Sequence, residues 1–386
     1  GAKYEAEGNA GIIDIRLKRN ENEGGNGSVS TTVSQGEYLR YNLNANGNFR
    51  NSNLNIFGNV GYADNESYNY MEFRNFQNGF VQDDINRSVN RSRTPSYRLG
   101  TDFFLGKKHT IGFLVGGIYT DNDSRSFNNV DLFTVANASE TPDSLLRART
   151  IGRADRGQNT FNLNYRYDAG KGKSLNIDLD YGRFRNDNLR DQPNTYLSPD
   201  GGEVLSNFDN YFDTPIDIDI ATAQVDFEQP LAGGQFGAGI RLSQVGTDNT
   251  FLFYDVPVGG DRILNSERSN QFDYDENVYA AYLSFAGKLN EKMNFSAGLR
   301  SEVTDATGDL TAFNGQSEPP VDLDYVSFFP SVGLTYALNQ RKGNTLSLNY
   351  GRRINRPDYN VLNPFRNQLS QLSYERGNPR LSPEIV

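Results

Sequence analysis

The chain carries few of the side chains that perform covalent chemistry. Its 386 residues include one histidine, His109, and no cysteine. With a single histidine and no cysteine, no Ser-His-Asp triad, zinc-thiolate site or HExxH metal site rises above chance. His109 follows a predicted tight turn at Gly106–Lys108, where a solvated turn residue is expected. The sequence therefore predicts a protein that is not an enzyme and that uses no cofactor.

Clustered carboxylates are the remaining candidates for a metal site, because calcium prefers several oxygen ligands. Two groups are close in sequence: Asp121 with Asp123, and Asp180 with Asp187 and Asp191. Arg125 occupies the third ligand position of an EF-hand loop that would start at Asp121. This spacing favours solvated loop charge, so no metal site is predicted.

Residues suited to non-covalent binding are more frequent. Aromatic rings stack on ligands and arginine donates hydrogen bonds, and both are effective when they stand in loops. Two predicted irregular segments combine these residue types. The candidate ligand-binding residues are Tyr68, Tyr70, Phe73 and Arg74 in the first segment, and Tyr359, Phe365 and Arg366 in the second.

The elements that would position these residues are β-strands. Between Tyr41 and Phe49, apolar or small side chains alternate with asparagines, which is the two-residue period of a strand with two unlike faces. The period recurs in hairpins as far as Tyr325–Leu338 and Thr345–Arg353. Counted from Ser28, about 13 antiparallel strands are predicted.

Composition indicates what the two faces contact. Hydrophobic residues make up only 36% of the chain and the mean hydropathy is -0.66. This is poor material for the core of a soluble protein, but it is expected of a barrel with a wet interior. Membrane-spanning strands need only about 9 to 11 residues each. We therefore expect lipid against the faces that carry Tyr41, Leu99, Leu163 and Leu346, and water against the opposite faces. The net charge of -10 argues against a nucleic-acid partner.

The connections alternate in length. Short turns join the two strands of each hairpin, whereas most links between hairpins run roughly 20 to 40 residues, longer than is usual in compact domains. The long links are predicted at 65–94, 121–158, 186–216, 246–275 and 304–322. Short turns at one end and long loops at the other are typical of outer-membrane barrels, with periplasmic turns and extracellular loops. The predicted fold is thus all-β: part of a transmembrane antiparallel up-and-down β-barrel.

Two segments after the last hairpin carry a signature. They are RRINRPDYNVLNPF, residues 352–365, and GNPRLSPE, residues 377–384. They resemble the TonB-dependent receptor family, specifically its outer membrane beta-barrel subfamily. The matching positions are Arg352, Arg353, Asn355, Arg356, Pro357, Asn363, Pro364, Phe365, Gly377, Asn378, Pro379, Pro383 and Glu384.

The N-terminus is similar to the same family. AKYEAEGNAGIIDIRLKR, residues 2–19, resembles the end of that family's plug domain. The resemblance implies that residues 1–27 are the end of a plug and its linker, and that residues 28–386 are an incomplete barrel, about 13 of an expected 22 or so strands.

The resemblance also implies a function. It predicts a receptor in the bacterial outer membrane that captures a nutrient with extracellular loops and imports it through a plugged barrel, without covalent chemistry. The implied partners are outer-membrane lipid, the TonB complex through a region upstream of this chain, and a small-molecule, oligosaccharide or peptide ligand. The resemblance leaves open whether a lipoprotein caps the barrel.

A second reading comes from a different class of protein. A soluble or surface-exposed β-sheet protein that recognises glycans or other proteins would also show alternating strands. It would not need the regular difference between short turns and long links, so the barrel is the preferred prediction.

Overall fold

The chain forms one large antiparallel sheet. The computed structural model describes residues 2–7, 23–77, 79–135, 141–315, 319–339, 343–363, 366–368, 374–378 and 380–386. The sheet has 17 strands. Thirteen are long: β1 (Gly24–Gln35), β2 (Leu39–Arg50), β3 (Leu54–Gln77), β4 (Phe80–Leu105), β5 (His109–Thr134), β6 (Ser144–Gly170), β7 (Lys173–Gln192), β11 (Ile216–Leu231), β12 (Gly234–Val256), β14 (Asn270–Asn290), β15 (Met293–Ala312), β16 (Val321–Asn339) and β17 (Asn344–Gly351). This confirms the number of strands predicted from the alternation.

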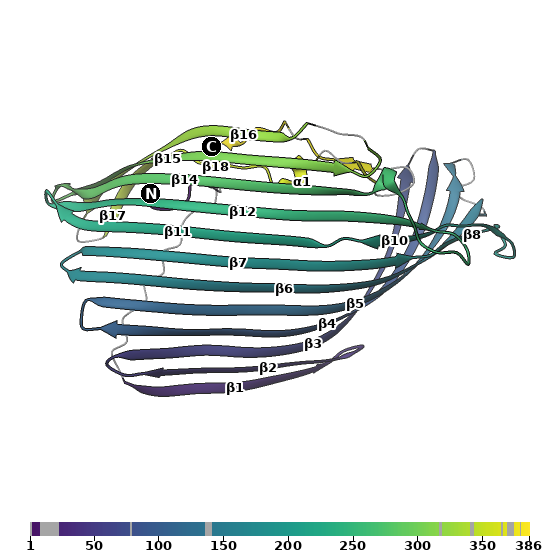
Figure 1. Ribbon diagram of the computed structural model, residues 1–386, viewed down its shortest axis with the longest axis horizontal. Helices are drawn as coiled ribbons and strands as arrows, with labels where there is room; N and C mark the ends of the chain where they lie inside the picture. The colour runs from purple at the N-terminus through teal and green to yellow at the C-terminus, as the bar shows by residue number, and fades with distance from the viewer. Residues whose placement is uncertain are drawn as a thin grey trace.

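Each long strand pairs with the next long strand along the chain. The neighbours run in the order β1 to β7, then β11, β12 and β14 to β17, and every pair is antiparallel. Among the described residues, β1 pairs only with β2, and β17 only with β16. The sheet is therefore an open, curved up-and-down sheet (Figure 1), as expected for a partial barrel.

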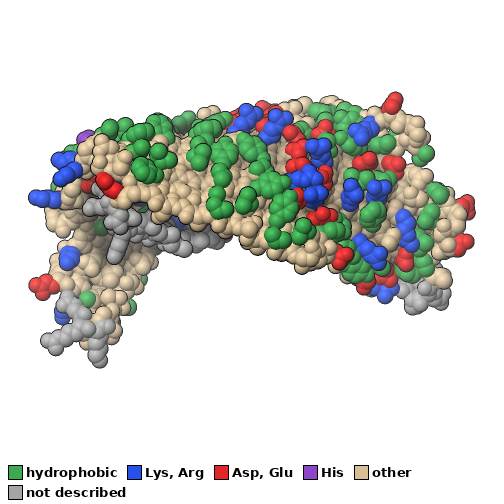
Figure 2. Space-filling model, turned by 90° about the horizontal axis from the view of Figure 1, so that it is seen from below, with side chains coloured by type: hydrophobic (Ala, Val, Ile, Leu, Met, Phe, Trp, Pro, Cys, Tyr) green, Lys and Arg blue, Asp and Glu red, His purple; other side chains and the backbone are tan. Residues whose placement is uncertain are grey.

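One face of the sheet carries an apolar belt. We define the belt by outward side chains that are between 39% and 70% exposed: Leu43, Phe49, Ile56, Val60, Leu99, Phe113, Leu163, Leu179, Ile240, Leu242, Leu283, Leu299, Val332 and Leu348. The cross-strand registers align these positions, as in Leu163 opposite Leu179 and Leu334 opposite Leu348. Figure 2 shows hydrophobic side chains gathered over one stretch of the surface. So large an exposed apolar surface requires a non-aqueous neighbour.

The strands continue far past the belt. β4 and β5 have 26 residues each and β6 has 27. At about 3.3 Å per residue this is roughly 85 Å, whereas about 9 to 11 residues suffice to cross the bilayer core. The prediction of irregular loops at 65–94 and 121–158 is therefore wrong. Both links are mostly the paired outer halves of the β3–β4 and β5–β6 hairpins.

The other three predicted loops also contain regular structure. The link 186–216 holds the end of β7 and the short strands β8 (Asn194–Leu197), β9 (Val204–Asn207) and β10 (Asp209–Asp213). The link 246–275 holds the end of β12, β13 (Ile263–Leu264), the 3₁₀ turn η2 (Ser266–Arg268) and the start of β14. The link 304–322 is largely the ends of β15 and β16. In these segments water contacts both faces of the sheet, so hydrophobic residues no longer alternate with polar ones although the strands remain hydrogen-bonded. The sequence therefore gives no sign of a strand there.

The N-terminal boundary also differs from the prediction. β1 begins at Gly24, so the last residues of the predicted linker belong to the sheet. Of the plug-like segment predicted at residues 2–19, only residues 2–7 are described. No helix in the described ranges is long and apolar enough to cross a bilayer.

The two terminal segments lie on the inner face, opposite the belt. The C-terminal segment contains β18 (Ile354–Asn355), α1 (Tyr359–Leu362), β19 (Arg366–Gln368), β20 (Tyr374–Arg376) and β21 (Glu384–Ile385). Leu362 packs into a buried cluster with Phe272, Tyr274 and Ala306. Ile354 packs with Phe329 and with Ala6 from the N-terminal segment.

Candidate functional site: the inner face and the vestibule cavity

A charged band on the outward face marks where the apolar belt ends. Beyond the tyrosines of the belt edge, outward positions become Asp64, Arg91, Arg93, Asp121, Arg183 and Asp217. Arg91 binds Asp64 at 2.8 Å, Arg93 binds Asp121 at 3.0 Å and Arg183 binds Asp217 at 3.1 Å. Tyr41 donates its hydroxyl to Asp64, as expected of an aromatic side chain at a membrane–water interface. Figure 2 shows the crowded acidic and basic side chains beside the hydrophobic stretch.

The charged band fixes the position of the bilayer along the strands. An arginine facing lipid at the midplane costs about 2 to 4 kcal/mol, so lipid must stop before the band. The long hairpins stand on the far side of it. Outer-membrane barrels place their long connections outside the cell, so these hairpins form the extracellular end.

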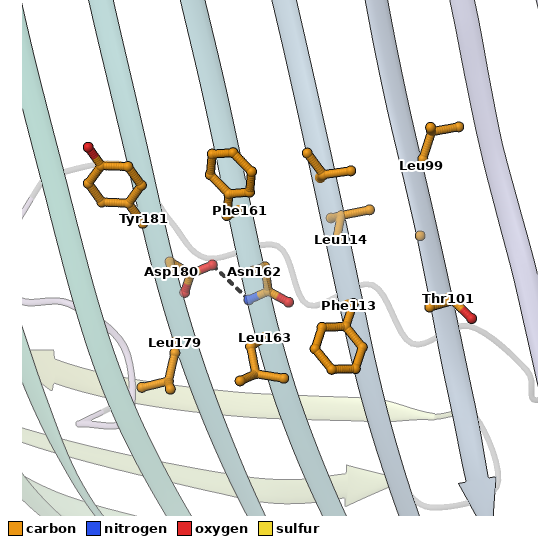
Figure 3. A pocket seen from close by; sticks show the side chains of 12 residues that line it. Leu99, Thr101, Phe113, Leu114, Phe161, Asn162, Leu163, Leu179, Asp180 and Tyr181 are labelled. Atoms are coloured by element: carbon orange, nitrogen blue, oxygen red, sulfur yellow. Dashed lines mark hydrogen bonds between the residues drawn. The ribbon is translucent and has the colours of Figure 1, made fainter.

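An apolar groove of about 600 Å³ lies within the belt and is not a candidate ligand site. It is lined mainly by Leu99, Phe113, Phe161, Leu163 and Leu179 on neighbouring strands (Figure 3). Its few polar lining groups, such as Asn162 and Asp180, bond to each other at 2.7 Å. The groove faces lipid and is a surface for acyl chains.

A different cavity lies at the extracellular end, and we call it the vestibule cavity. It has a volume of about 650 Å³. Its wall comes from the outer parts of β4, β5, β6 and β7, from β8 and β10, and from η2. The aromatic lining residues are Phe80, Phe133, Tyr196, Phe208 and Phe212, and the amide and carboxylate lining residues include Gln82, Asp84, Asn128, Gln192, Asn194 and Asn210.

The polar groups that line this cavity differ in whether they have hydrogen-bond partners. Asn128 donates to the Asp84 carboxylate at 3.3 Å, and Asn194 donates to the carbonyl of Phe208 at 2.9 Å. Asn210 is 8% exposed, and its Oδ1 atom has no hydrogen-bond partner. Burial raises the pKa of the Asp84 carboxyl above its ordinary value. A buried acceptor without a donor is costly to the protein alone, and a ligand can relieve that cost.

One cation reaches the cavity. Arg268 lies over the Phe253 ring, with its Cζ atom 3.4 Å from the ring centroid. Burial lowers the pKa of its guanidinium group. The Phe253 ring packs edge to face against the Phe212 ring, with 5.0 Å between the two ring centroids. Arg268 is therefore held at the wall by stacking.

The signature arginine Arg356 is the centre of a buried network on the inner face. Its guanidinium group contacts Glu302 at 2.6 Å, the Tyr325 hydroxyl at 3.2 Å and the Thr304 hydroxyl at 3.3 Å. Glu302 is also paired with Arg300, and both of these side chains are less than 5% exposed. The network fastens the C-terminal segment to β15 and β16.

The two signature segments pair with each other. β18 pairs with β21 through Ile354 opposite Ile385 and Asn355 opposite Glu384. The Gly377 amide donates to the Asn363 carbonyl at 3.0 Å, and a Cβ atom at Gly377 would collide with that carbonyl. Residues far apart in the signature therefore form one folded unit.

The N-terminal segment lies along the inner wall and is held by ion pairs. Lys3 binds Glu228 of β11 at 2.8 Å, Glu5 binds Arg241 of β12, and Glu7 binds Arg356 at 3.3 Å. The backbone amide of Ile354 donates to the carbonyl of Ala6 at 3.1 Å. Residues 2–7 thus join the wall to the C-terminal segment.

A family model settles the class of protein. The model described as "Outer membrane protein beta-barrel family" matches residues 166–386, more than half of the chain. The chain belongs to this family. Membership places the protein in the bacterial outer membrane and identifies lipid as the neighbour of the apolar belt.

Other comparisons add little to the family assignment. No curated protein sequence matches the chain. Three solved structures with low identity are the outer membrane protease OmpT of Escherichia coli (11% identity, 74% of this chain and 96% of that chain, TM-score 0.26), the translocator domain of the autotransporter NalP of Neisseria meningitidis (13%, 78% and 83%, 0.23) and the toluene transporter TodX of Pseudomonas putida (12%, 86% and 81%, 0.29). These TM-scores are too low to support an argument about this chain.

In this family member, the predicted ligand-binding residues are only partly described. Tyr68, Tyr70, Phe73 and Arg74 lie in the outer half of β3 instead of a loop. The three aromatic side chains are each more than 40% exposed, and Arg74 pairs with Asp83 at 3.0 Å. None of the four lines the vestibule cavity. Tyr359 begins α1 and Arg366 begins β19, but their side chains, like all of Phe365, lie outside the description.

Two other predictions concern His109 and the carboxylates. His109 is the first residue of β5, and its ring contacts the Tyr165 hydroxyl at 2.8 Å and the Tyr167 ring at a centroid distance of 4.9 Å. It therefore belongs to an aromatic cluster and is not a free turn residue. Asp121 and Asp123 both contact Arg93. No group of acidic and histidine side chains suited to a metal ion occurs in the described part of the chain.

Sequence reasoning missed the vestibule cavity. The sequence places Asn210, Phe212 and Arg268 in links that it predicts to be irregular. The only signal in the sequence was their residue types, because the cavity forms from six separate stretches of chain.

Proposed function

We propose that this protein is a TonB-dependent outer-membrane receptor that captures a nutrient at its extracellular end and imports it through a plugged barrel. The observation that carries the proposal is the N-terminal segment on the inner wall. Three ion pairs, Lys3–Glu228, Glu5–Arg241 and Glu7–Arg356, hold a segment that does not belong to the sheet inside the curve of the wall. An internal segment with polar contacts that can be exchanged for water suits a lumen that opens during transport.

The outer halves of the hairpins supply the capture surface in this proposal. Tyr68, Tyr70, Phe73 and Arg74 on β3 are candidate first contacts, since exposed aromatic and arginine side chains can stack on and bond to a ligand. Tyr359, Phe365 and Arg366 remain candidates from the sequence. No covalent step is part of the proposal.

Uptake measurements in cells test the proposal. Cells with and without the full-length protein would be grown in a complex medium, and the depletion of nutrients would be followed by mass spectrometry. We expect at least one nutrient to be depleted only when the protein is present, and we expect this depletion to cease in cells that lack TonB. Depletion that continues without TonB would show a passive channel. Equal depletion in all strains would favour a binding or adhesion protein.

A further inference from the structure

We propose that the vestibule cavity binds a neutral, polyhydroxylated ligand, that is, an oligosaccharide or a similar polyol. This inference rests on the proposed receptor function and specifies its substrate class. The cavity volume of about 650 Å³ lies within the roughly 300 to 1,000 Å³ typical of small-molecule sites. The cavity lies on the extracellular side of the charged band, where a ligand arrives first.

The polar lining suits hydroxyl groups. Side-chain amides each present a donor and an acceptor, as each sugar hydroxyl does. Gln82, Asn128, Gln192, Asn194 and Asn210 place five amides around one space. Asn210 is the most buried of the five, and its enclosed Oδ1 atom has no hydrogen-bond partner. A turn of this amide toward the cavity would bring the oxygen to a ligand hydroxyl without breaking a hydrogen bond of that atom.

The aromatic residues of the lining suit the apolar faces of sugar rings. Pyranose rings expose apolar C–H groups on their faces, and flat aromatic side chains cover such groups with little loss of conformational entropy. Phe212 is fixed by Phe253 at 5.0 Å and by Phe251 at 6.0 Å between ring centroids. Phe133, which is 7% exposed, and Tyr196 of β8 also belong to the lining. The cavity thus combines fixed rings with amides.

The charges of the lining argue against strongly ionic ligands. Of its lining residues, all of which are described, only Asp84, Asp143 and Arg268 carry a charge at neutral pH. Asp143 accepts a hydrogen bond from the Thr134 amide, and Arg268 lies over the Phe253 ring. Asp84 accepts a hydrogen bond from Asn128, so each of the three charged groups already has a partner in the protein. An ionic ligand would have to displace these partners, whereas a neutral ligand would not.

Binding to the purified full-length protein tests this inference without any need for TonB. The probes would be a panel of unmodified neutral oligosaccharides, a panel of oligosaccharides that contain uronic acids, ferric catecholate complexes and short basic peptides, each measured by calorimetry. We expect at least one neutral oligosaccharide to bind and the ionic probes to bind at least tenfold more weakly. Absence of binding to every neutral oligosaccharide, or tighter binding of an ionic probe, would overturn the inference.

Variants locate the binding within the cavity. Phe212→Ala is expected to weaken oligosaccharide binding at least tenfold, and Asn210→Leu severalfold. Tyr211→Ala is the matched control, because Tyr211 is the neighbouring aromatic residue of β10 and does not line the cavity. Asn210→Leu removes an acceptor that has no partner, so it should not lower stability, and normal thermal unfolding would exclude misfolding as the cause. Binding unaffected by both cavity variants would overturn the inference.

The outcomes separate the two proposals. Oligosaccharide binding together with TonB-independent uptake would reject the proposed function and leave the ligand assignment in place. TonB-dependent uptake of an ionic nutrient that competes at the cavity would reject the ligand assignment and leave the proposed function in place.

Discussion

At the scale of single residues, Arg356 explains why an arginine stands in the signature. Its guanidinium group bonds to Glu302, Tyr325 and Thr304 at once, and only 8% of its side chain is exposed. Its planar group has several donors in fixed directions, which a lysine ammonium group cannot reproduce. The residue therefore positions the C-terminal segment against the wall.

The Arg356→Ala variant is expected to lower the free energy of unfolding by about 1 to 3 kcal/mol, because Glu302 stays buried with Arg300 as its remaining partner. The temperature at which the folded band disappears in gel electrophoresis would measure the loss. Arg380→Ala, at an exposed position of the same segment, should leave that temperature unchanged. Equal behaviour of the two variants would contradict the role given to Arg356.

Gly377 is a second signature residue whose type has a steric explanation. A Cβ atom at this position would collide with the carbonyl oxygens of Asn363 and Val361. Gly377→Ala should therefore separate the signature segments at a cost of about 1 to 3 kcal/mol. Limited proteolysis should then cut within residues 352–386 faster than in the parent protein. Gly351→Ala is the control, since a Cβ atom there meets no atom within 4 Å. Unchanged cleavage of the Gly377 variant would show that the pairing does not depend on this glycine.

Asp84 provides a prediction about pH. Burial raises the pKa of the Asp84 carboxyl, so the folded protein binds a proton at this group more tightly than the unfolded chain does. Protonation of Asp84 therefore stabilises the folded protein at low pH, and this contribution is lost as the pH rises through the folded-state pKa. Asp84→Asn is neutral at every pH and keeps an acceptor for Asn128. The variant should unfold at a higher temperature than the parent at pH 7, and the difference should shrink as the pH falls toward about 4, the ordinary pKa of aspartate. A difference that is the same at both pH values would refute the assignment.

At the scale of elements, the sequence predicted the strands where their two faces meet different surroundings. Tyr41–Phe49 alternates because one face contacts lipid and the other contacts water. The outer half of β3, from Glu66 to Gln77, has water on both sides, so hydrophobicity no longer marks the period. Pairs such as Arg74 with Asp83 continue the ladder there, but a charge pair across a hairpin is not recognisable until the hairpin is known.

The two faces of one strand can be tested within β7. Leu179 belongs to the apolar belt and is 44% exposed, so Leu179→Arg should cost about 2 to 4 kcal/mol in the bilayer and reduce the amount of protein assembled in outer membranes. Asn176, at an inward position of the same strand, should tolerate arginine because it faces the wet interior. Equal assembly of the two variants would contradict the orientation of the sheet.

At the scale of the whole molecule, the sequence predicted that the inner face of the sheet contacts water, but it did not predict which residues come together there. The vestibule cavity brings Asp84, Asn210 and Arg268 together, although each lies more than fifty residues from the next in the chain. Their proximity depends on the curvature of the sheet and on the course of β10, neither of which is encoded in a local pattern. The family signature was recognisable without a physical reason, and the reason became visible only when its two segments were found paired.

The curved wall holds the N-terminal segment, residues 2–7, on its inner side. Glu228 and Arg241 of the wall bind Lys3 and Glu5 through ion pairs that are partly open to water. Each such pair contributes at most about 1 kcal/mol, so Glu228→Gln with Arg241→Gln should leave the barrel folded but loosen residues 2–7.

Cells that carry this double variant of the full-length protein should become several times more sensitive to a large hydrophilic antibiotic, because the lumen would leak. Arg185→Gln, in an outward ion pair with Asp187, should not change sensitivity. If the double variant keeps the parent's sensitivity at equal protein levels, residues 2–7 do not help to close the lumen.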